Sequence, residues 1–527
     1  MSLALADAAR HDAPAAQDEG EWERSFGRHW KWDVAIMAIV VFLFGAIRPL
    51  ADPDLPMHLT VGEWIARHRS VPVVEPFSWT AVGQPYYAYS WLPQWVYFET
   101  FSAFGSYGLR ALQGLLVLSG ASSAFLLARA SGWRPSLGLI LAGFNLIVTA
   151  FFVAMLRPQS ILLITMPIIW AMFIRIARGE GSWRSVLGLF IASALTANSH
   201  LFFPITMAPA VTLWVHRRLG SRFSVAAMVA VAAGWMTSPY ALRWPRVFSH
   251  NFGSHALTSF PSPITELQPG FVVMLRPPVG PMLLLVSCML VVPWIIGRAP
   301  LRSRERLCAA AYWIIGAIAF GYAVRLFVLW WVLSIVTFGS ALAWATRDAT
   351  EAPPRRSIRL LGLVACLVII SAELVRTRDL RALEGSTRNR RLPTFGAKPA
   401  EQIAKWLRSN TAPDARGRIM TSFVFGSYLT WRLPGYSTSI DSRGLQPDSV
   451  TAAEAVVSAA AQGYPLGPWR SADLVILPVQ FRAAAALDTA AGWRRMVAVE
   501  GDPVRSDSTA LWVKGDWWAR HARSGSK

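Results

Sequence analysis

The chain contains a succession of apolar runs, and this succession limits the folds that it can adopt. About eleven runs are each roughly 16–22 residues long, the length at which an α-helix crosses the hydrocarbon layer of a membrane. Of all residues, 54% are hydrophobic and only 16% are charged, and the mean hydropathy is +0.36. The sequence therefore predicts a polytopic α-helical membrane protein. The predicted spans are 34–50, 107–128, 136–155, 159–175, 184–199, 201–216, 223–238, 279–297, 307–323, 326–345 and 359–376.

Arginine placement predicts how these spans are oriented. With a cytoplasmic N-terminus, the five short cytoplasmic loops hold sixteen arginines, whereas the short loops on the other side hold only Arg157 and Arg325. This asymmetry is the one that the positive-inside rule describes. It requires the short aromatic segment 91–104 to be a helix in the membrane interface, because a further span there would reverse the asymmetry.

The same orientation assigns the polar segments to compartments. Residues 1–33 lack the apolar stretch and cleavage site of a secretory signal, so we expect a cytoplasmic N-terminal tail and an uncleaved first span. Residues 51–106 and 239–278 are expected to form long extracytoplasmic loops. A basic, turn-rich linker is predicted over 377–396. Strand and helix patterns then alternate over 397–527, which predicts an extracytoplasmic α/β domain.

Charge and cysteine content exclude other classes of protein. The net charge of +20 does not indicate nucleic-acid binding, because the arginines flank apolar runs and do not form one basic face. Cys288, Cys308 and Cys366 lie in or beside apolar runs without CxxC spacing. The sequence therefore predicts neither a disulfide framework nor a zinc site.

Several polar side chains stand at the extracytoplasmic ends of different spans. Ionisable groups at membrane depth are costly and usually pair with one another or serve a pathway. We therefore expect one polar cavity at the outer interface, although ordinary interfacial groups that touch water would leave the same pattern. The candidates are Asp52, Asp54, His58, Arg157, Gln159, Asn198, His200, Tyr240, Arg243, His250, His255, Glu266 and Arg325.

Sugar transfer is a chemistry that these residue types suit, since it needs a base for the acceptor hydroxyl and cations for the leaving phosphate. Asp52 or Asp54 is a candidate base, and a helix N-cap or a turn is the alternative role. Arg157 and Arg325 are candidate phosphate ligands, with extension toward lipid headgroups as the alternative.

The remaining candidates have structural alternatives of the same kind. His58 and His200 are candidate helpers or simply solvated histidines. Glu266 is a candidate substrate ligand or a plain loop carboxylate. The tryptophans Trp64, Trp79 and Trp91 are candidates to stack on a sugar or to mark the membrane interface.

Sequence blocks resemble a known group of enzymes. Residues 52–94, DPDLPMHLTVGEWIARHRSVPVVEPFSWTAVGQPYYAYSWLPQ, resemble the first extracytoplasmic loop of bacterial GT-C glycosyltransferases. LRPQS, TANSHLFFP, SPYAL and ITELQP are similar to later blocks in the same order. FGSYLTWRLPGYSTSIDSRG, at 425–444, resembles a DGR-containing block. The resemblance spans nearly the whole chain, and its first-loop and DGR-like blocks are the most specific.

The resemblance implies a multi-pass enzyme of the bacterial inner membrane that uses a polyprenyl-phosphate-linked sugar and inverts the sugar. Asp52, Asp54 and His58 match the first motif, Arg157 and His200 match later ones, and the expected role of Asp441 and Arg443 is to organise a turn. The implied partners are a lipid-linked sugar donor, an envelope glycan, lipid or protein acceptor, and membrane lipids. A divalent metal at Asp52 or Asp54 is compatible with this group, but no spacing demands it.

Departures from the family pattern leave other functions open. Pro56 and Met57 replace an aromatic pair, Ser90 replaces an acidic residue, Glu75 replaces an aspartate and Ser442 replaces a glycine. A transporter or flippase for a lipid-linked glycan is one alternative, although it would need polar residues at mid-membrane. A non-catalytic envelope-assembly protein is the other.

Overall fold

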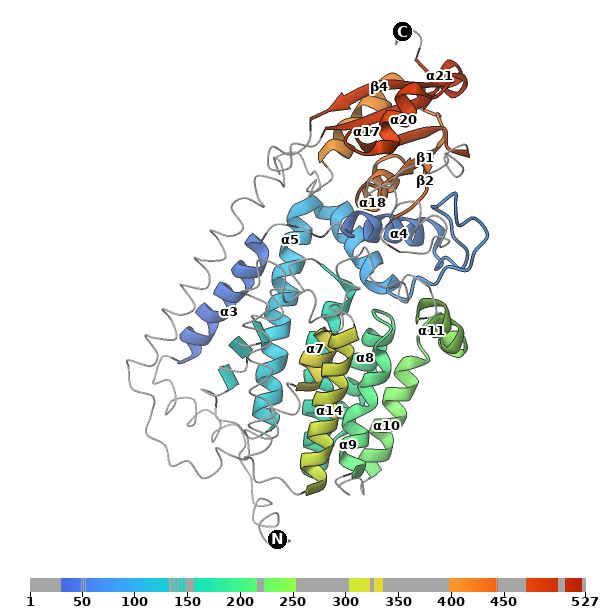
Figure 1. Ribbon diagram of the computed structural model, residues 1–527. Helices are drawn as coiled ribbons and strands as arrows, with labels where there is room; N and C mark the ends of the chain where they lie inside the picture. Colours follow the sequence, from blue (N-terminus) through green and yellow to red (C-terminus); the bar gives the residue numbers. More distant parts are fainter. Residues whose placement is uncertain are drawn as a thin grey trace.

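The computed structural model has a helical part and a small sheet domain that lies at one end of it (Figure 1). Glu266, Arg325, His255, the spans 279–297 and 359–376 and the linker 377–396 lie outside the described residues. The described residues are 30–48, 50, 52, 54–131, 135, 138–139, 142–143, 145–146, 156–215, 222–252, 303–322, 327–334, 398–441, 443, 471–500 and 508–523.

The helical part consists of apolar helices at the predicted positions. Two segments, Trp91–Ala130 and Pro158–Ala177, are long and apolar enough to cross a membrane, and four more apolar helices are shorter. The expected number of about eleven spans stays a prediction. The helices are α3 (Trp30–Ile47), α5 (Trp91–Ala130), α7 (Leu162–Ala177), α8 (Trp183–Ala197), α9 (Ala208–Val215), α10 (Arg222–Trp235) and α14 (Ser303–Tyr322), with short 3-10 turns at η2 (Pro158–Ile161) and η3 (Phe203–Met207).

These helices bury one continuous apolar core. α5 packs between α3 and α7, and α8 packs between α7 and α10. Ile169 and Phe173 of α7 and Leu189 of α8 are fully buried in this core. Two hydrogen bonds join polar groups inside it, as a low-dielectric environment favours. Thr196 Oγ1 donates to Thr165 Oγ1 at 2.8 Å, and Ser193 Oγ donates to the Val231 carbonyl at 2.9 Å.

The helix α5 changes direction at Gly105. This glycine has φ 61° and ψ −152°, a conformation that is essentially restricted to glycine, so the helix breaks there. The predicted interface helix 91–104 and the predicted span 107–128 are therefore the two arms of one 40-residue element. The first arm lies near the sheet domain, and the second enters the bundle (Figure 1).

The first long loop begins with the helix α4 (Leu55–His68), which the sequence pattern predicts as an amphipathic helix. One side of α4, with Leu55 and Leu59, packs against Tyr97 and Leu109 of α5. The contact is close because Gly62 has no side chain: a Cβ atom there would lie 2.1 Å from the Gln94 carbonyl oxygen. The two helices are therefore fixed against each other.

The C-terminal domain contains a five-stranded mixed sheet in the order β2-β1-β3-β5-β4. β2, β1 and β3 are parallel, whereas β5 is antiparallel to both β3 and β4. The strands are β1 (Gly417–Thr421), β2 (Tyr436–Thr438), β3 (Leu474–Pro478), β4 (Trp493–Val499) and β5 (Thr509–Lys514). β4 and β5 form an antiparallel pair, and strands and helices alternate along this domain as the sequence pattern predicts.

Helices cover both faces of this sheet because its strands carry apolar side chains on both sides. Ile419 and Ile476 face α17 (Lys398–Asn410), α18 (Phe423–Arg432) and α21 (Gly515–His521). Val475 and Trp512 face α20 (Arg482–Thr489) on the other side. Trp79 of the first loop also packs into this second core. The sheet domain is thus completed by a residue from a distant part of the chain.

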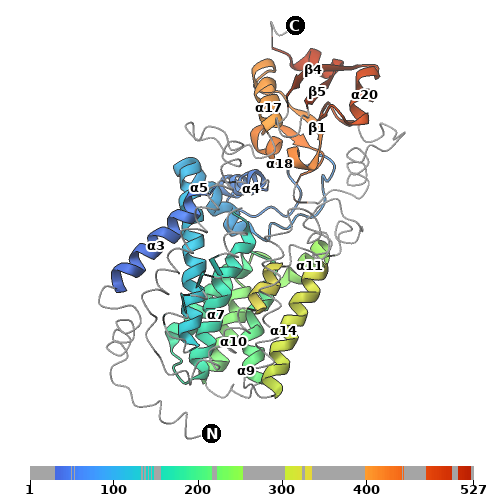
Figure 2. The same cartoon turned by 60° about the vertical axis from the view of Figure 1, so that its left-hand side comes forward.

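The domain rests on the first loop. The helix α18 packs against α4 (Figure 2). Its Trp431 contacts Phe101 of α5 edge to face, with 5.9 Å between the ring centroids. Two further short helices, η4 (Ala241–Arg243) and α11 (Trp244–Phe252), lie at the same end of the bundle (Figure 1).

Candidate functional site at the outer helix ends

The structure brings Asp52, Asp54 and Arg157 together; we call these three residues the helix-end cluster. The Arg157 Nε atom lies 3.5 Å from Asp52 Oδ2, and its Nη2 atom lies 3.7 Å from Asp54 Oδ2. Asp52 and Asp54 stand between α3 and α4, whereas Arg157 precedes η2 and α7. Residues from distant helix ends therefore share one charged site, as the sequence predicts.

Local packing explains why Arg157 points to the carboxylates. Leu156, directly before it, is fully buried with Leu55 and Leu59 of α4. Leu156 has φ 50°, in the left-handed region, which costs a non-glycine residue about 1 kcal/mol. The packing of its side chain holds this conformation, and the chain then directs Arg157 toward the start of α4.

The two aspartates have different environments. The Asp52 side chain is completely buried, and its Oδ1 accepts the backbone N–H of Asp54 at 3.1 Å, which forms an Asx turn. The Asp54 side chain is 26% exposed and makes no capping hydrogen bond, although the residue occupies the N-cap position of α4. Asp52 therefore has the turn role that was one alternative for this motif, and Asp54 is the more exposed of the two carboxylates.

His58 lies one turn further along α4. Its Nδ1 is 3.2 Å from Gln94 Nε2, so Gln94 donates and Nδ1 accepts. Its ring meets Tyr97 edge to face at 6.2 Å. Burial, reinforced by the positive charge of Arg157, lowers the pKa of His58 to about 3. The imidazole is therefore neutral at physiological pH and acts as a polar, uncharged neighbour of the cluster.

Gln159 and Asn198 have contrasting surroundings. The Nε2 of Gln159, in η2, is buried and has no hydrogen-bond partner among the described residues. Asn198 is satisfied on both sides: its Nδ2 donates to the Ala194 carbonyl and to Thr237 Oγ1, and its Oδ1 accepts from Trp91 Nε1 at 2.8 Å. Asn198 thus joins α8, α10 and the start of α5, whereas the Gln159 donor is oriented without a protein acceptor in the described part of the chain.

His200 and the second loop form a neighbouring aromatic region. His200 Nδ1 accepts the backbone N–H of Phe202 at 3.2 Å, and the ring meets Tyr89 of the first loop at 6.2 Å. Tyr240 packs edge to face on Tyr87 at 5.6 Å, and His250 meets Tyr87 at 5.4 Å. These contacts attach the first loop to the ends of α8 and α10. In these contacts the side chains of His200 and Tyr240 pack against the first loop.

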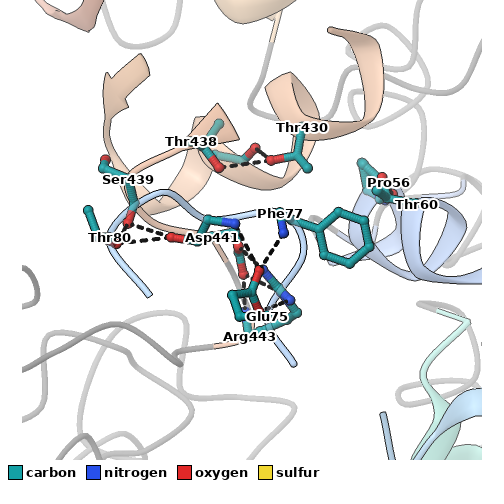
Figure 3. Close-up of polar contacts among 12 residues, drawn as sticks. Pro56, Thr60, Glu75, Phe77, Thr80, Thr430, Thr438, Ser439, Asp441 and Arg443 are labelled. Carbon is teal, nitrogen blue, oxygen red and sulfur yellow. Dashed lines mark hydrogen bonds and ion pairs between the residues drawn. The ribbon is translucent and has the colours of Figure 1, made fainter. Parts of the chain in front are cut away.

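Asp441 and Arg443 belong to a second charged group. Arg443 pairs with both Asp441 and Glu75, and Glu75 is in the first loop (Figure 3). We call Glu75, Asp441 and Arg443 the loop–domain cluster. The expected role of Asp441 in a local turn is present, because its Oδ1 accepts the Arg443 backbone N–H at 2.9 Å. The partnership with Glu75 extends that role to a distant segment.

A divalent metal does not fit the helix-end cluster well. The Arg157 guanidinium stands beside both carboxylates, where a cation would otherwise bind them. In the described part of the chain, no group of three or more His, Cys, Asp and Glu side chains is placed to hold a metal. We therefore derive no chemical step through a metal.

Two residues of the site are absent from the sequence-based candidates. Gln94 and Tyr97 both contact His58, but they lie in the aromatic segment 91–104, where an interface helix accounts for their composition. The structure buries Gln94, and a glutamine within an otherwise apolar helix is the sequence signal that would have indicated it.

Comparison with known proteins identifies the fold. No protein-family model and no curated protein matches the sequence. The arabinofuranosyltransferase AftD from Mycobacteria is similar in structure, with a TM-score of 0.55 and 15% identity over 92% of this chain. This chain spans only 40% of the AftD chain.

This chain matches a larger share of two further structures. The oligosaccharyltransferase AglB from Archaeoglobus fulgidus, in complex with an inhibitory peptide and a dolichol-phosphate, gives a TM-score of 0.52 at 11% identity, over 87% of this chain and 70% of AglB. ArnT from Cupriavidus metallidurans, bound to undecaprenyl phosphate, gives 0.50 at 14% identity, over 91% of this chain and 97% of ArnT. At these identities the similarity establishes the fold alone. The chain has the fold of the GT-C membrane glycosyltransferases.

Proposed function

We propose that the chain is a membrane glycosyltransferase that moves a sugar from a polyprenyl-phosphate donor to a cell-envelope acceptor outside the cytoplasm. The observation that carries this proposal is the helix-end cluster, in which Asp54 and Arg157 meet at the ends of helices in a GT-C fold. The lipid phosphates bound to AglB and ArnT support a donor of this class. The proposed site is the bacterial inner membrane, with the C-terminal domain outside the cytoplasm.

Asp54 is the proposed base. A general base must be within reach of the acceptor hydroxyl, and the Asp54 side chain is 26% exposed whereas that of Asp52 is fully buried. Asp52 would instead hold the turn that presents Asp54.

Arg157 is the proposed ligand of the donor phosphate. Its guanidinium lies beside Asp54 at the helix ends, and planar, two-pronged donation suits phosphoryl oxygens. The buried Gln159 amide supplies a further donor on the same turn. Asn198 and His200 stay candidates for binding donor or acceptor, and so do Glu266 and Arg325, which lie outside the described residues.

The proposed reaction is a single displacement. The acceptor hydroxyl oxygen attacks the anomeric carbon of the donor sugar while Asp54 takes the hydroxyl proton. The bond between the anomeric carbon and the phosphate oxygen breaks, and its electrons stay on the polyprenyl phosphate, which Arg157 stabilises. Attack opposite the leaving group inverts the anomeric carbon. Neutral His58 lies beside this site as a hydrogen-bonding neighbour.

The test is transfer by the purified full-length protein in lipid nanodiscs, with a panel of polyprenyl-phosphate hexoses and pentoses and release of polyprenyl phosphate as the readout. Asp54→Asn and Asp52→Asn are compared with Glu63→Gln, a carboxylate on α4 that pairs with Arg67 away from the site. We expect release by the wild type and the Glu63 variant and its loss in Asp54→Asn. Equal release by Asp54→Asn would exclude this base.

The alternatives make different predictions in the same assay. A non-catalytic assembly protein releases no polyprenyl phosphate from any donor, although the protein is folded. A transporter or flippase moves the intact lipid-linked sugar across a vesicle membrane without cleaving it. The glycosyltransferase assignment requires cleavage that depends on Asp54.

A further inference from the structure

The loop–domain cluster joins two segments that are 368 residues apart in the chain. Arg443 Nη1 lies 2.5 Å from Glu75 Oε2, and Nη2 lies 2.7 Å from Glu75 Oε1, so the guanidinium holds this carboxylate with two parallel bonds. Its Nε and Nη2 also bind Asp441, at 2.9 and 2.6 Å. The side chains of Arg443, Glu75 and Asp441 are 8%, 1% and 0% exposed.

Two aromatic rings of the first loop enclose the guanidinium. The Arg443 Cζ atom is 4.9 Å from the centroid of the Phe77 ring and 4.8 Å from that of Tyr86. Burial opposes the charge of Arg443, but Asp441 and Glu75 outweigh this effect and raise its pKa well above the usual value. The arginine is thus a permanent cation inside a pocket that the first loop builds.

The rings connect this pocket to α4. Tyr86 is buried in one apolar cluster with Met57, Val61 and Ile65, and Phe77 packs against the same cluster. Met57, Val61 and Ile65 repeat every four residues and form one face of α4. Figure 3 shows the Phe77 ring directed toward Pro56 and Thr60 of α4. Contacts therefore run without interruption from Arg443 to the helix that carries Asp54 at its start and His58 in its first turn.

Hydrogen bonds between the first loop and the domain add to this attachment. The Thr80 hydroxyl donates to the Ser439 carbonyl at 2.5 Å, and the Trp79 backbone N–H donates to the Thr438 carbonyl at 3.2 Å. Trp79 Nε1 donates to the Ile419 carbonyl at 3.2 Å. The first loop thus binds the ends of the parallel strands β1 and β2. Within the domain, Gly426 of α18 lets the segment that leads to Asp441 lie close to this helix, since a Cβ atom there would lie 1.7 Å from the Ile440 carbonyl oxygen.

The energetics indicate that this cluster defines one arrangement of the first loop on the domain more than it stabilises the fold. Desolvating an arginine and two carboxylates is expensive, and a buried ion pair is often no more stabilising than apolar residues of equal volume. What such a cluster provides is one defined arrangement, because any displacement leaves a buried charge without its partner. Apolar packing alone would allow the first loop to slide across the domain.

We propose that Arg443 is a positioning residue which, through Glu75 and the rings of Phe77 and Tyr86, fixes α4 and therefore Asp54 relative to the donor site. This inference rests on the proposed function. It assigns the C-terminal domain a part in the reaction, as the support that holds the first loop in its working position. Arg443 acts through other residues and is not required to touch a substrate.

The primary test is Glu75→Gln in the full-length protein in nanodiscs. This variant leaves Arg443 paired with Asp441 and keeps an oxygen for the N–H groups of Phe77 and Ser78, which Glu75 accepts at 2.7 and 2.8 Å. The control is Glu401→Gln, which disrupts a buried carboxylate paired with Arg432 inside the same domain. Hydrogen exchange of α4 and of residues 71–90 is measured together with kcat and the donor KM.

We expect faster exchange in α4 and residues 71–90 of Glu75→Gln, with kcat lower by about tenfold because a small displacement of a reacting group is costly. The donor KM should change by less than about twofold, because Arg157 is not displaced. Arg443→Gln should lower kcat at least as much, and the double variant should add nothing further, as expected of residues in one network.

The possible outcomes separate this inference from the proposed function. Wild-type exchange in α4 of Glu75→Gln overturns the positioning role, whatever the value of kcat. The same exchange and kcat changes in Glu401→Gln also overturn it, since they would reflect general destabilisation of the domain. If the wild type transfers no sugar from any donor, the proposed function fails, and the exchange comparison still decides whether Glu75 fixes α4.

Discussion

The helix-end cluster and the loop–domain cluster have the same composition, two carboxylates and one arginine, but different geometry. In the first, the charged atoms are 3.5 and 3.7 Å apart and Asp54 is 26% exposed. In the second, the contacts are 2.5–2.9 Å long and every side chain is at most 8% exposed. Short, paired contacts fix a structure, whereas longer ones at an accessible carboxylate leave room for a ligand to enter.

The comparison indicates a division of labour. The loop–domain cluster has each guanidinium nitrogen committed to a carboxylate oxygen, so it has no capacity for substrate. The helix-end cluster has longer contacts and one partly exposed carboxylate, Asp54. Variants in the helix-end cluster should therefore affect mainly activity, whereas variants in the loop–domain cluster should also lower stability.

The largest expected effect is on activity at Asp54. Asp54→Asn removes the proposed base and should lower kcat by about 10³-fold, within the range of general base catalysis. The thermal unfolding midpoint should stay close to that of the wild type because the residue is partly exposed. Initial rates of polyprenyl phosphate release measure the effect. A loss below tenfold would remove the functional distinction between the clusters.

The next effect is on stability at Arg443. Arg443→Met leaves Glu75 and Asp441 buried without a cation, which should cost about 3 kcal/mol or more. The unfolding midpoint in detergent, measured by intrinsic tryptophan fluorescence, should fall clearly. Arg157→Met is the matched variant in the helix-end cluster and should lower the midpoint less, because its contacts are longer and only Asp52 of the two carboxylates is fully buried. Equal losses in the two variants would contradict the comparison.

A smaller effect is expected when Arg157 is replaced by lysine. Lysine keeps the positive charge but loses planar, two-pronged donation, so the donor KM should rise about tenfold, which corresponds to 1.4 kcal/mol. Arg175→Lys is a suitable control, because Arg175 pairs with Glu180 at the exposed end of α7. Steady-state kinetics with varied donor concentration separate KM from kcat. An unchanged KM would argue against phosphate binding by Arg157.

The smallest effect concerns pH and His58. Its pKa is lowered from 6.5 to about 3, so between these values the folded protein binds fewer protons than the unfolded chain. The stability associated with neutral His58 is therefore complete above pH 6.5 and decreases as the pH falls below it. His58→Gln should reduce the drop in unfolding midpoint between pH 7 and pH 5. Identical pH dependence in both proteins would show that this imidazole is not held neutral by the fold.

Sequence reasoning was sufficient for the helix-end cluster because its residues are conspicuous against their surroundings. Asp52, Asp54 and Arg157 are ionisable groups directly beside apolar runs, and loop-charge asymmetry places them on one side. Their meeting in space follows from that placement. Which carboxylate is exposed depends on the Asx turn at Asp52 and could not be predicted from a D-x-D spacing.

The loop–domain cluster was not predictable for a physical reason. Glu75 and Arg443 lie in turn-rich segments, where charged residues are common and local patterns give no partner. Their pairing depends on how the sheet domain packs on α4, which is a property of tertiary structure. The residues Gln94 and Tyr97 were missed for a related reason, since each fits the composition of an interface helix. The number of spans, the linker and the roles of Glu266 and Arg325 remain sequence predictions.

Trp79 has a consequence for how the protein is made. The apolar core between the sheet and α20 includes this side chain, although it is translated hundreds of residues before the strands around it. Because domains start to fold as they leave the ribosome, the sheet domain has to complete its core on a part of the chain that was made much earlier. The order of synthesis thus means that the domain folds against a first loop that is already present. A C-terminal domain expressed separately would expose an apolar gap and be prone to aggregate.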